Sequence, residues 1–246
     1  MRHCLSSFVK SLTRPVETVV LADRCTPAFL AMACRQLRPL RPRVIDNSRV
    51  RDELEIEGLP EKNRHLANQL LRMLELAAGH DVAYFCEQDY VFRRGALEAC
   101  ADAFKSIPTL AVLSPFDHPD RHLPAQEPLL ASPQVFPGTL TDWKAVSSTN
   151  GNFMWRMSFV APRLAWVKKT LSAGGLDYAL TNGVHAQGHV VLSPTTSLVQ
   201  HIRTDGSNAS PTFGPCVSLQ MMARATRALR AASRSITTSN ERRHRR

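Results

Sequence analysis

The sequence lacks the spacings and apolar runs that identify several common classes of protein. Its six cysteines include no C-x-x-C pair and fit neither a zinc ribbon nor a disulfide scaffold, so we expect reduced thiols. No apolar run approaches the roughly 18 residues that a membrane span needs. The usual P-loop and dinucleotide-binding motifs are absent. Residues 1–10 show no sustained apolar stretch and no small-residue cleavage site, so we expect no signal peptide.

Basic charge is also scarce once the C-terminal end is set aside. The formal net charge is +10, but residues 224–246 carry eight arginines and one acid, a net +7, which leaves +3 for the rest. The remainder has no basic stripe interleaved with aromatics, so we do not expect specific nucleic-acid binding. The arginine-rich tail favours peripheral contact with anionic lipids. We therefore expect a cytoplasmic protein that touches the inner membrane face.

Strand-like and helix-like stretches alternate along the first half. The pattern predicts helices over 5–12, from Thr26-Pro27 to about 37, over 61–78 and over 95–104, and strands over 17–22, 43–46, 82–86 and 109–114. Such alternation is typical of an α/β fold with a mostly parallel sheet flanked by helices. Ligands of such sheets bind beyond the carboxyl ends of the strands, where Asp23, Asp46 and Asp89 fall.

The second half is less regular. Five prolines between 119 and 137 predict a long loop or extended segment over 116–149, of the kind that forms a substrate wall in an enzyme. Strands are expected over 152–160 and 190–192, helices over 162–171 and 176–186, and a last apolar stretch over 197–202. We expect one domain over 1–222, with halves at about 1–115 and 116–210. An amphipathic helix over 217–234 leads into a disordered tail, so that 223–246 is the basic end.

The strand that ends in Glu87 and Asp89 is the most informative stretch. Residues i and i+2 of a strand point to the same face, so two carboxylates are clustered there. Two neighbouring anions repel unless a positive group answers them, and Mg²⁺ or Mn²⁺ prefers carboxylate and phosphate oxygens. The alternative is a strand end whose acids are solvated or paired with Arg93 or Arg94.

The order of these elements resembles a glycosyltransferase of GT-A fold, family-two-like, with the motif Glu87-Gln88-Asp89-Tyr90 in place of the family's E-D-D-Y form of D-x-D. The resemblance covers roughly 5–207 and includes a late Ser197-Leu-Val-Gln-His-Ile202. It implies a GT-A-like nucleotide-diphospho-sugar transferase fold. It also implies transfer of a sugar from a UDP- or GDP-linked donor to a glycan or lipid-linked acceptor.

The resemblance also assigns roles to residues. Asp89 would bind the Mn²⁺ or Mg²⁺ that holds the donor diphosphate, and His201 would be a further metal ligand. Asp23 would contact the uracil or ribose, and Asn63 and Glu87 complete the expected donor site. For His201 the alternative is a hydrogen-bonded core histidine.

The acceptor half offers weaker candidates. Asp177, which follows a glycine pair, is the candidate general base; an acid favoured at a helix N-terminus is the alternative. Trp143, Asn150, Asn152 and Trp155 are candidate acceptor-binding residues, although the same residues suit an ordinary turn followed by a packed strand.

Two departures from the family pattern keep a second hypothesis open. Gln88 replaces the usual middle carboxylate, and the strand that normally precedes the first helix is missing or short. The alternative is a GT-A-fold binding protein that has lost catalysis. The pairs His118/His122 and His185/His189 have i,i+4 spacing, but Pro119 and Gly188 and the lack of H-E-x-x-H argue against zinc sites.

Overall fold

The computed structural model describes residues 2–23, 25–47, 61–123, 134–149, 151–174, 177–202 and 209–213, without the side chains of 61–63. The elements in chain order are α1 (Arg2–Lys10), β1 (Val19–Ala22), α2 (Pro27–Leu37), η1 (Arg38–Leu40), β2 (Arg43–Asp46), α3 (Glu61–Leu76), β3 (Val82–Cys86), β4 (Tyr90–Phe92), α4 (Ala96–Ser106), β5 (Leu110–Leu113), η2 (Pro119–His122), β6 (Val135–Phe136), β7 (Trp143–Ala145), β8 (Asn152–Arg156), α5 (Met157–Val160), η4 (Ala161–Arg163), α6 (Leu164–Ser172), α7 (Asp177–Ala186), β9 (Val190–Pro194) and β10 (Val199–His201).

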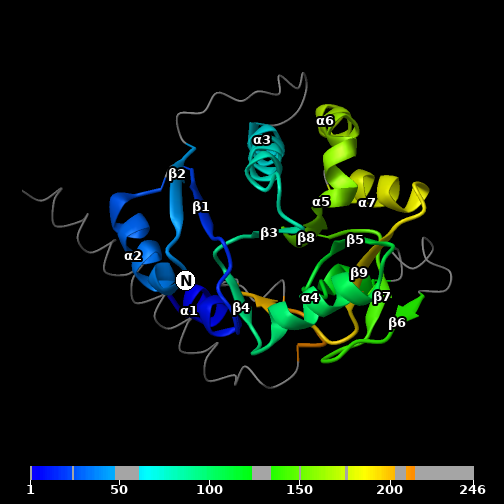
Figure 1. The fold of residues 1–246 in the computed structure, drawn as a ribbon, viewed down its shortest axis with the longest axis horizontal. Helices are drawn as coiled ribbons and strands as arrows, with labels where there is room; N and C mark the ends of the chain where they lie inside the picture. The colour runs from blue at the N-terminus through cyan, green and yellow to red at the C-terminus, as the bar shows by residue number, and fades with distance from the viewer. Residues whose placement is uncertain are drawn as a thin grey trace, which may run out of the picture.

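The main sheet has six strands in the order β3-β8-β5-β9-β7-β6 (Figure 1). Only β5 and β9 are parallel neighbours; the other four pairs are antiparallel. The α/β class is therefore confirmed, but the prediction of a mostly parallel sheet is wrong. The reason is that β8 lies between β3 and β5 and runs against both, a pairing that hydrophobic pattern does not encode.

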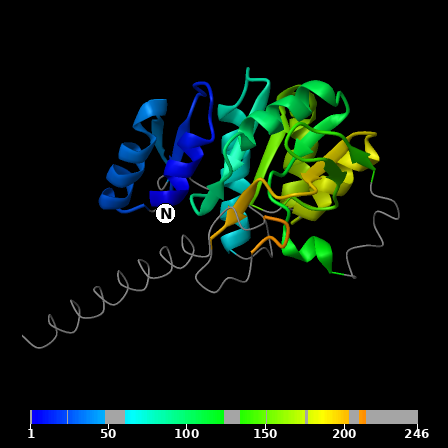
Figure 2. The same cartoon turned by 90° about the horizontal axis from the view of Figure 1, so that it is seen from below.

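Two smaller sheets accompany it. Strands β1 and β2 pair in parallel, and β4 pairs antiparallel with β10. In both views, α1, α2, β1 and β2 lie together at one end of the molecule (Figure 2), and α2 starts with the predicted cap, in which the Thr26 hydroxyl accepts a hydrogen bond from the Phe29 amide. The first described element is the helix α1.

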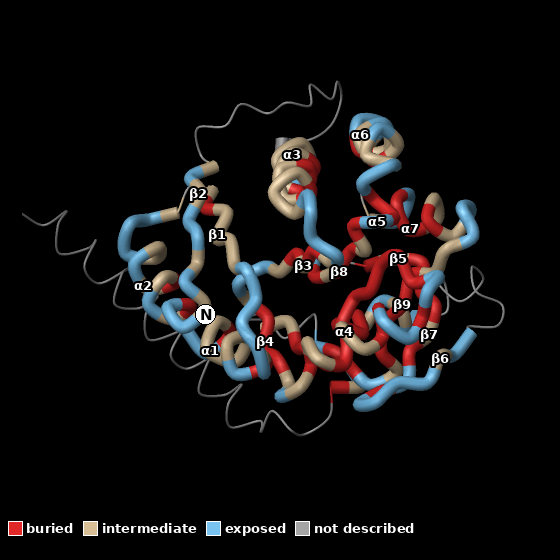
Figure 3. The backbone as a smooth tube through the Cα atoms, in the orientation of Figure 1, coloured by how far each residue is buried: buried red, intermediate tan, exposed pale blue. Residues whose placement is uncertain are grey.

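Alternating side chains of the main sheet fill two cores. On one face, Ala83 and Phe85 of β3 pack with residues of α3, α6 and α7; on the other, Val82 and Tyr84 join residues of α4, β4 and β10. Figure 3 shows buried residues concentrated in this sheet, whereas β1, β2 and α2 are mostly intermediate or exposed. The ends of the sheet strands thus position polar residues, such as Glu87 after β3 and Asn152 at the start of β8.

Several predicted bounds differ from the structure. The strand predicted over 152–160 ends at Arg156, where α5 begins, and the loop predicted over 116–149 contains η2, β6 and β7. Arg156 donates hydrogen bonds to the carbonyls of Phe104, Ile107 and Leu110, which hold the strand end against α4 and β5. The helix predicted over 217–234 and the basic tail lie outside the described residues. Among those described, no helix is long and apolar enough to cross a membrane.

Candidate metal centre

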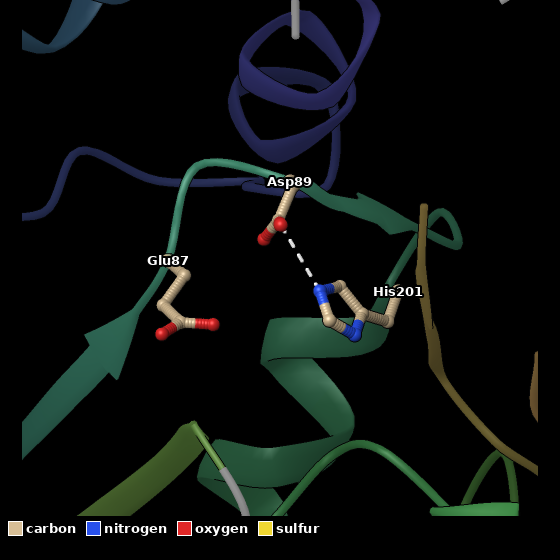
Figure 4. A group of neighbouring side chains, drawn as sticks. All are labelled: Glu87, Asp89 and His201. Atoms are coloured by element: carbon tan, nitrogen blue, oxygen red, sulfur yellow. Dashed lines mark hydrogen bonds and ion pairs between the residues drawn. The ribbon is translucent and has the colours of Figure 1, made fainter. Parts of the chain in front are cut away.

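Three ligating side chains meet beside the corner between β3 and β4. Single ligand atoms of Glu87, Asp89 and His201 all lie within 4.8 Å of one another (Figure 4). The His201 Nε2 atom is 3.0 Å from Asp89 Oδ2, and the Glu87 carboxylate faces the pair from the end of β3. Two carboxylates and an imidazole form a donor set that suits a divalent transition metal such as Mn²⁺.

Pairing of two short strands brings residues 112 positions apart into contact. Asp89 immediately precedes β4, and His201 is the last residue of β10, which runs antiparallel with His201 opposite Tyr90. The Ile202 amide donates a 2.8 Å hydrogen bond to the Asp89 carbonyl and extends this ladder by one step. The backbone therefore fixes the two predicted metal ligands side by side.

The imidazole of His201 is held by rings as well as by the backbone. It stacks on Tyr90, with centroids 4.6 Å apart and planes 13° from parallel, and Phe116 meets it edge-on. Its side chain is only 12% exposed. Burial, with the charge of Glu87 as the next cause, raises the pKa of the Tyr90 phenol, so this ring stays neutral beside the acids.

Asp89 supports the presence of a cation through an unsatisfied atom. Its Oδ1 is buried and has no hydrogen-bond partner among the described residues, whereas Oδ2 contacts His201. A buried carboxylate oxygen without a partner is costly, and a bound cation removes that cost. Metal–ligand bonds of about 2.1 Å hold ligand atoms up to about 4.2 Å apart, so the observed group needs only small side-chain rotations.

Glu87 lies against a glycine that the sequence did not single out. A Cβ built on Gly151 would lie 2.9 and 3.1 Å from the two carboxylate oxygens of Glu87. Asn152, next in the chain, is fully buried and accepts a 2.6 Å hydrogen bond from the Tyr84 hydroxyl. The backbone at the start of β8 therefore packs against the Glu87 carboxylate.

Replacing Gly151 by Ala should weaken Mn²⁺ binding by about 10-fold, the size of a typical loss of ligand orientation. The added methyl group displaces the Glu87 carboxylate, which is the movable end of a flexible side chain, so the melting temperature should change little. Titration of Mn²⁺ followed by electron paramagnetic resonance measures the affinity. In a Glu87→Ala background the same glycine change should have no further effect; an equal loss there would show that Gly151 acts elsewhere.

Asp177 lies at the start of α7 and forms hydrogen bonds with Thr149 in the loop before β8. Its Oδ1 accepts hydrogen bonds from the Thr149 amide, at 2.6 Å, and from the Thr149 hydroxyl, at 3.1 Å. Burial lowers the pKa of His118, and the charges of Asp120 and Asp177 oppose this shift. The expected base thus also anchors the loop that leads to Gly151.

The remaining predicted residues divide into three groups. Asp23 accepts a hydrogen bond from Gln69 of α3 at the end of β1, as expected for a strand-end acid. Nothing is described for the Asn63 side chain, and Asn150 lies outside the described residues. The candidate acceptor residues Trp143, Asn152 and Trp155 are at most 2% exposed, which favours the packed-strand interpretation over direct contact with a sugar.

The two histidine pairs make other contacts. The His118 Nδ1 accepts from the Asp120 amide, His122 pairs with Asp117, and His185 lies 2.9 Å from the Val146 carbonyl. His189 packs on Phe159. Five cysteines, those at 4, 25, 34, 86 and 100, are free thiols.

Sequence reasoning missed a buried acid and a partly buried arginine beside this region. Asp117 is fully buried and lies 3.1 Å from Lys144 and 2.8 Å from His122. Arg121 donates to the carbonyls of Phe116 and Ser148 and to the Ser193 hydroxyl. Both lie in a proline-containing stretch with no periodic pattern, so no signal in the sequence marked them.

No protein-family model matches this chain, and no curated protein matches it.

Proposed function

We propose that this chain is a glycosyltransferase that uses Mn²⁺ or Mg²⁺ to move a sugar from a UDP- or GDP-linked donor to a glycan or lipid-linked acceptor. The supporting observation is the meeting of Glu87, Asp89 and His201, because two of these residues were expected as metal ligands from the GT-A resemblance alone. A bound divalent cation neutralises charge on a departing diphosphate.

In this proposal, different residues of the chain bind the cation, bind the nucleoside and activate the acceptor. Glu87, Asp89 and His201 hold the cation, and Asp23 at the end of β1 provides a carboxylate for the nucleoside. Asp177 is the proposed base for the acceptor hydroxyl; its Oδ1 already accepts two hydrogen bonds from Thr149, which fix its direction. The expected membrane contact of the basic tail concerns residues outside the described part of the chain.

A binding protein that has lost catalysis is the second candidate, and Gln88 in the middle of the acidic motif favours it. The strand expected to run through 87–89 ends at Cys86, and these three residues form the turn between β3 and β4. Glu87, Asp89 and His201 come together there without position 88, so the glutamine does not remove a ligand from the cluster. The two candidates therefore differ in turnover and in metal-dependent nucleotide affinity rather than in fold.

Calorimetry with UDP and GDP, with and without Mn²⁺, tests the proposal. We expect nucleotide binding that requires the metal and that falls at least 10-fold in His201→Ala, because a ligand is lost. The matched control is His80→Ala, which removes an exposed imidazole paired with Glu17. Absence of metal-dependent nucleotide binding would contradict the enzyme and favour the second candidate.

A further inference from the structure

The segment of residues 209–213, here called the clasp, returns to the strand that carries His201. The Ser210 amide donates a 3.0 Å hydrogen bond to Gln200 Oε1, and the Ser197 amide donates one of 3.0 Å to the Thr212 hydroxyl. At the end of the clasp, the Phe213 ring lies 4.8 Å from the Arg93 guanidinium carbon. The clasp therefore contacts both ends of the β10 region and the residue after β4.

Gln200 joins the clasp to the metal ligand. Its side chain is almost fully buried; Oε1 accepts from Ser210, and Nε2 donates a 2.8 Å hydrogen bond to the carbonyl of His201 itself. Because neighbours in a strand point to opposite faces, Gln200 reaches away from the Tyr90–His201 stack while His201 reaches into the cluster. The side-chain amide of Gln200 thus fixes the backbone of the metal ligand His201 from the face opposite the cluster.

Thr212 ties the other end of the clasp to the main sheet. Its hydroxyl donates a 2.8 Å hydrogen bond to Asp117 Oδ2, the buried carboxylate that Lys144 of β7 and His122 also contact. Hydrogen bonds to a charged acceptor are roughly twice as strong as neutral ones. The clasp is therefore fixed to a charged group that the sheet holds in place.

The strand needs such support because it is very short. Strand β10 has three residues and pairs with one neighbour, β4, among the described strands. An isolated two-stranded ribbon is marginally stable in water. The clasp supports β10 through the Gln200 side chain and through Ser197, two residues before the strand, rather than through a backbone ladder.

We propose that the clasp fixes His201 for metal binding, with Gln200 and Thr212 as positioning residues. The inference rests on the proposed metal site, but it also predicts the orientation of the His201 ring in the metal-free protein. Loosening β10 should disturb the stack on Tyr90 first, because that stack is the contact directly opposite in the register.

The test uses the full chain with Gln200→Met and Thr212→Val, which keep volume and remove the hydrogen bonds. Thr212→Ser keeps the hydroxyl. Gln187→Met removes a comparable glutamine just after α7, whose Oε1 accepts from Arg163 and whose Nε2 donates to the Gly183 carbonyl. The readouts are the His201 ring signal in ¹H–¹³C spectra, assigned by its loss in His201→Ala, and the Mn²⁺ affinity.

In the Gln200 and Thr212→Val variants we expect the ring signal to move toward that of an unstacked histidine and Mn²⁺ affinity to fall about 10-fold. Thr212→Ser and Gln187→Met should retain both. An unchanged ring signal in Thr212→Val, or an equal change in Thr212→Ser, would overturn the inference even if Gln200→Met does not fold. Absence of Mn²⁺ binding by the unmodified protein would refute the proposed function, while the ring signal would still decide the role of the clasp.

Discussion

Replacing Asp89 by Asn should lower the rate of the proposed sugar transfer by about 100-fold or more, the loss expected when a main electrostatic stabiliser is removed. The change keeps the size of the side chain and the backbone carbonyl that accepts from Ile202, so the β4–β10 ladder stays intact. It removes the negative charge next to His201 and gives the buried Oδ1 position a neutral amide. A cation bound by the remaining ligands would be under-neutralised.

The measurement is nucleotide release from the donor in the presence of Mn²⁺, with melting temperature recorded in parallel. The matched control is Asp102→Asn on α4, an acid that is half exposed and paired with Lys105. Exposed pairs contribute at most about 1 kcal/mol, so this variant should keep its rate and its stability. Near-normal turnover of Asp89→Asn would show that the carboxylate is not a metal ligand.

Elements with their own local signals could be predicted from the sequence. The Thr26-Pro27 cap predicted the start of α2, and the apolar stripe of 61–78 predicted α3, which ends at Leu76. The β-branched and aromatic run 82–86 predicted β3 with its bounds. In each case the residues that decide the structure are neighbours along the chain.

Elements that depend on distant partners could not be predicted in this way. Strand β8 was expected as a strand, but nothing in its residues indicates that it separates β3 from β5. Strands β4 and β7 have three residues each and carry too little pattern to be recognised. The mixed sheet follows from these pairings, which depend on tertiary packing rather than on propensity.

The candidate site shows the same division. The pair Asp89 and His201 was expected through a family resemblance, and the structure places them 3.0 Å apart. Gly151 escaped notice because its role is to leave space, which no motif records. Asp117 and Arg121 escaped notice because charged residues are expected on the surface, and only the fold shows that Asp117 is buried and that Arg121 has three hydrogen-bond acceptors around it.

Replacing Arg121 by Lys should destabilise the protein by about 3 kcal/mol, because one ammonium cannot reproduce the geometry of a guanidinium. Arg121 joins three segments: its Nη1 donates to the Phe116 carbonyl and to Ser193 of β9, and its Nη2 donates to the Ser148 carbonyl at 2.7 Å. Burial lowers the pKa of Arg121 to about 10, and the charges of Asp117 and Asp177 oppose this shift. At neutral pH the group is therefore charged and needs its acceptors.

Thermal unfolding at pH 7 measures the effect, and for a chain of this length 3 kcal/mol corresponds to a fall of roughly 6–12 °C. The pKa lies far above 7 and is lowered from its unfolded value, so the folded protein binds fewer protons than the unfolded chain only near pH 10–12. The loss of stability caused by Arg121→Lys should accordingly be the same at pH 6 and pH 8.

Arg163→Lys is the matched control, since Arg163 also donates to a carbonyl and to a side chain but lies at the end of η4 over Phe159 and has two acceptors instead of three. This variant should lower the free energy of unfolding by less than about 1 kcal/mol.

Arg121 and Asp177 bind adjacent residues of one loop, Ser148 and Thr149, and that loop leads to Gly151, which packs against Glu87. Arg121→Lys should therefore also weaken Mn²⁺ binding, whereas equal melting and metal affinity in the two lysine variants would show that the Arg121 guanidinium supports neither the fold nor the site.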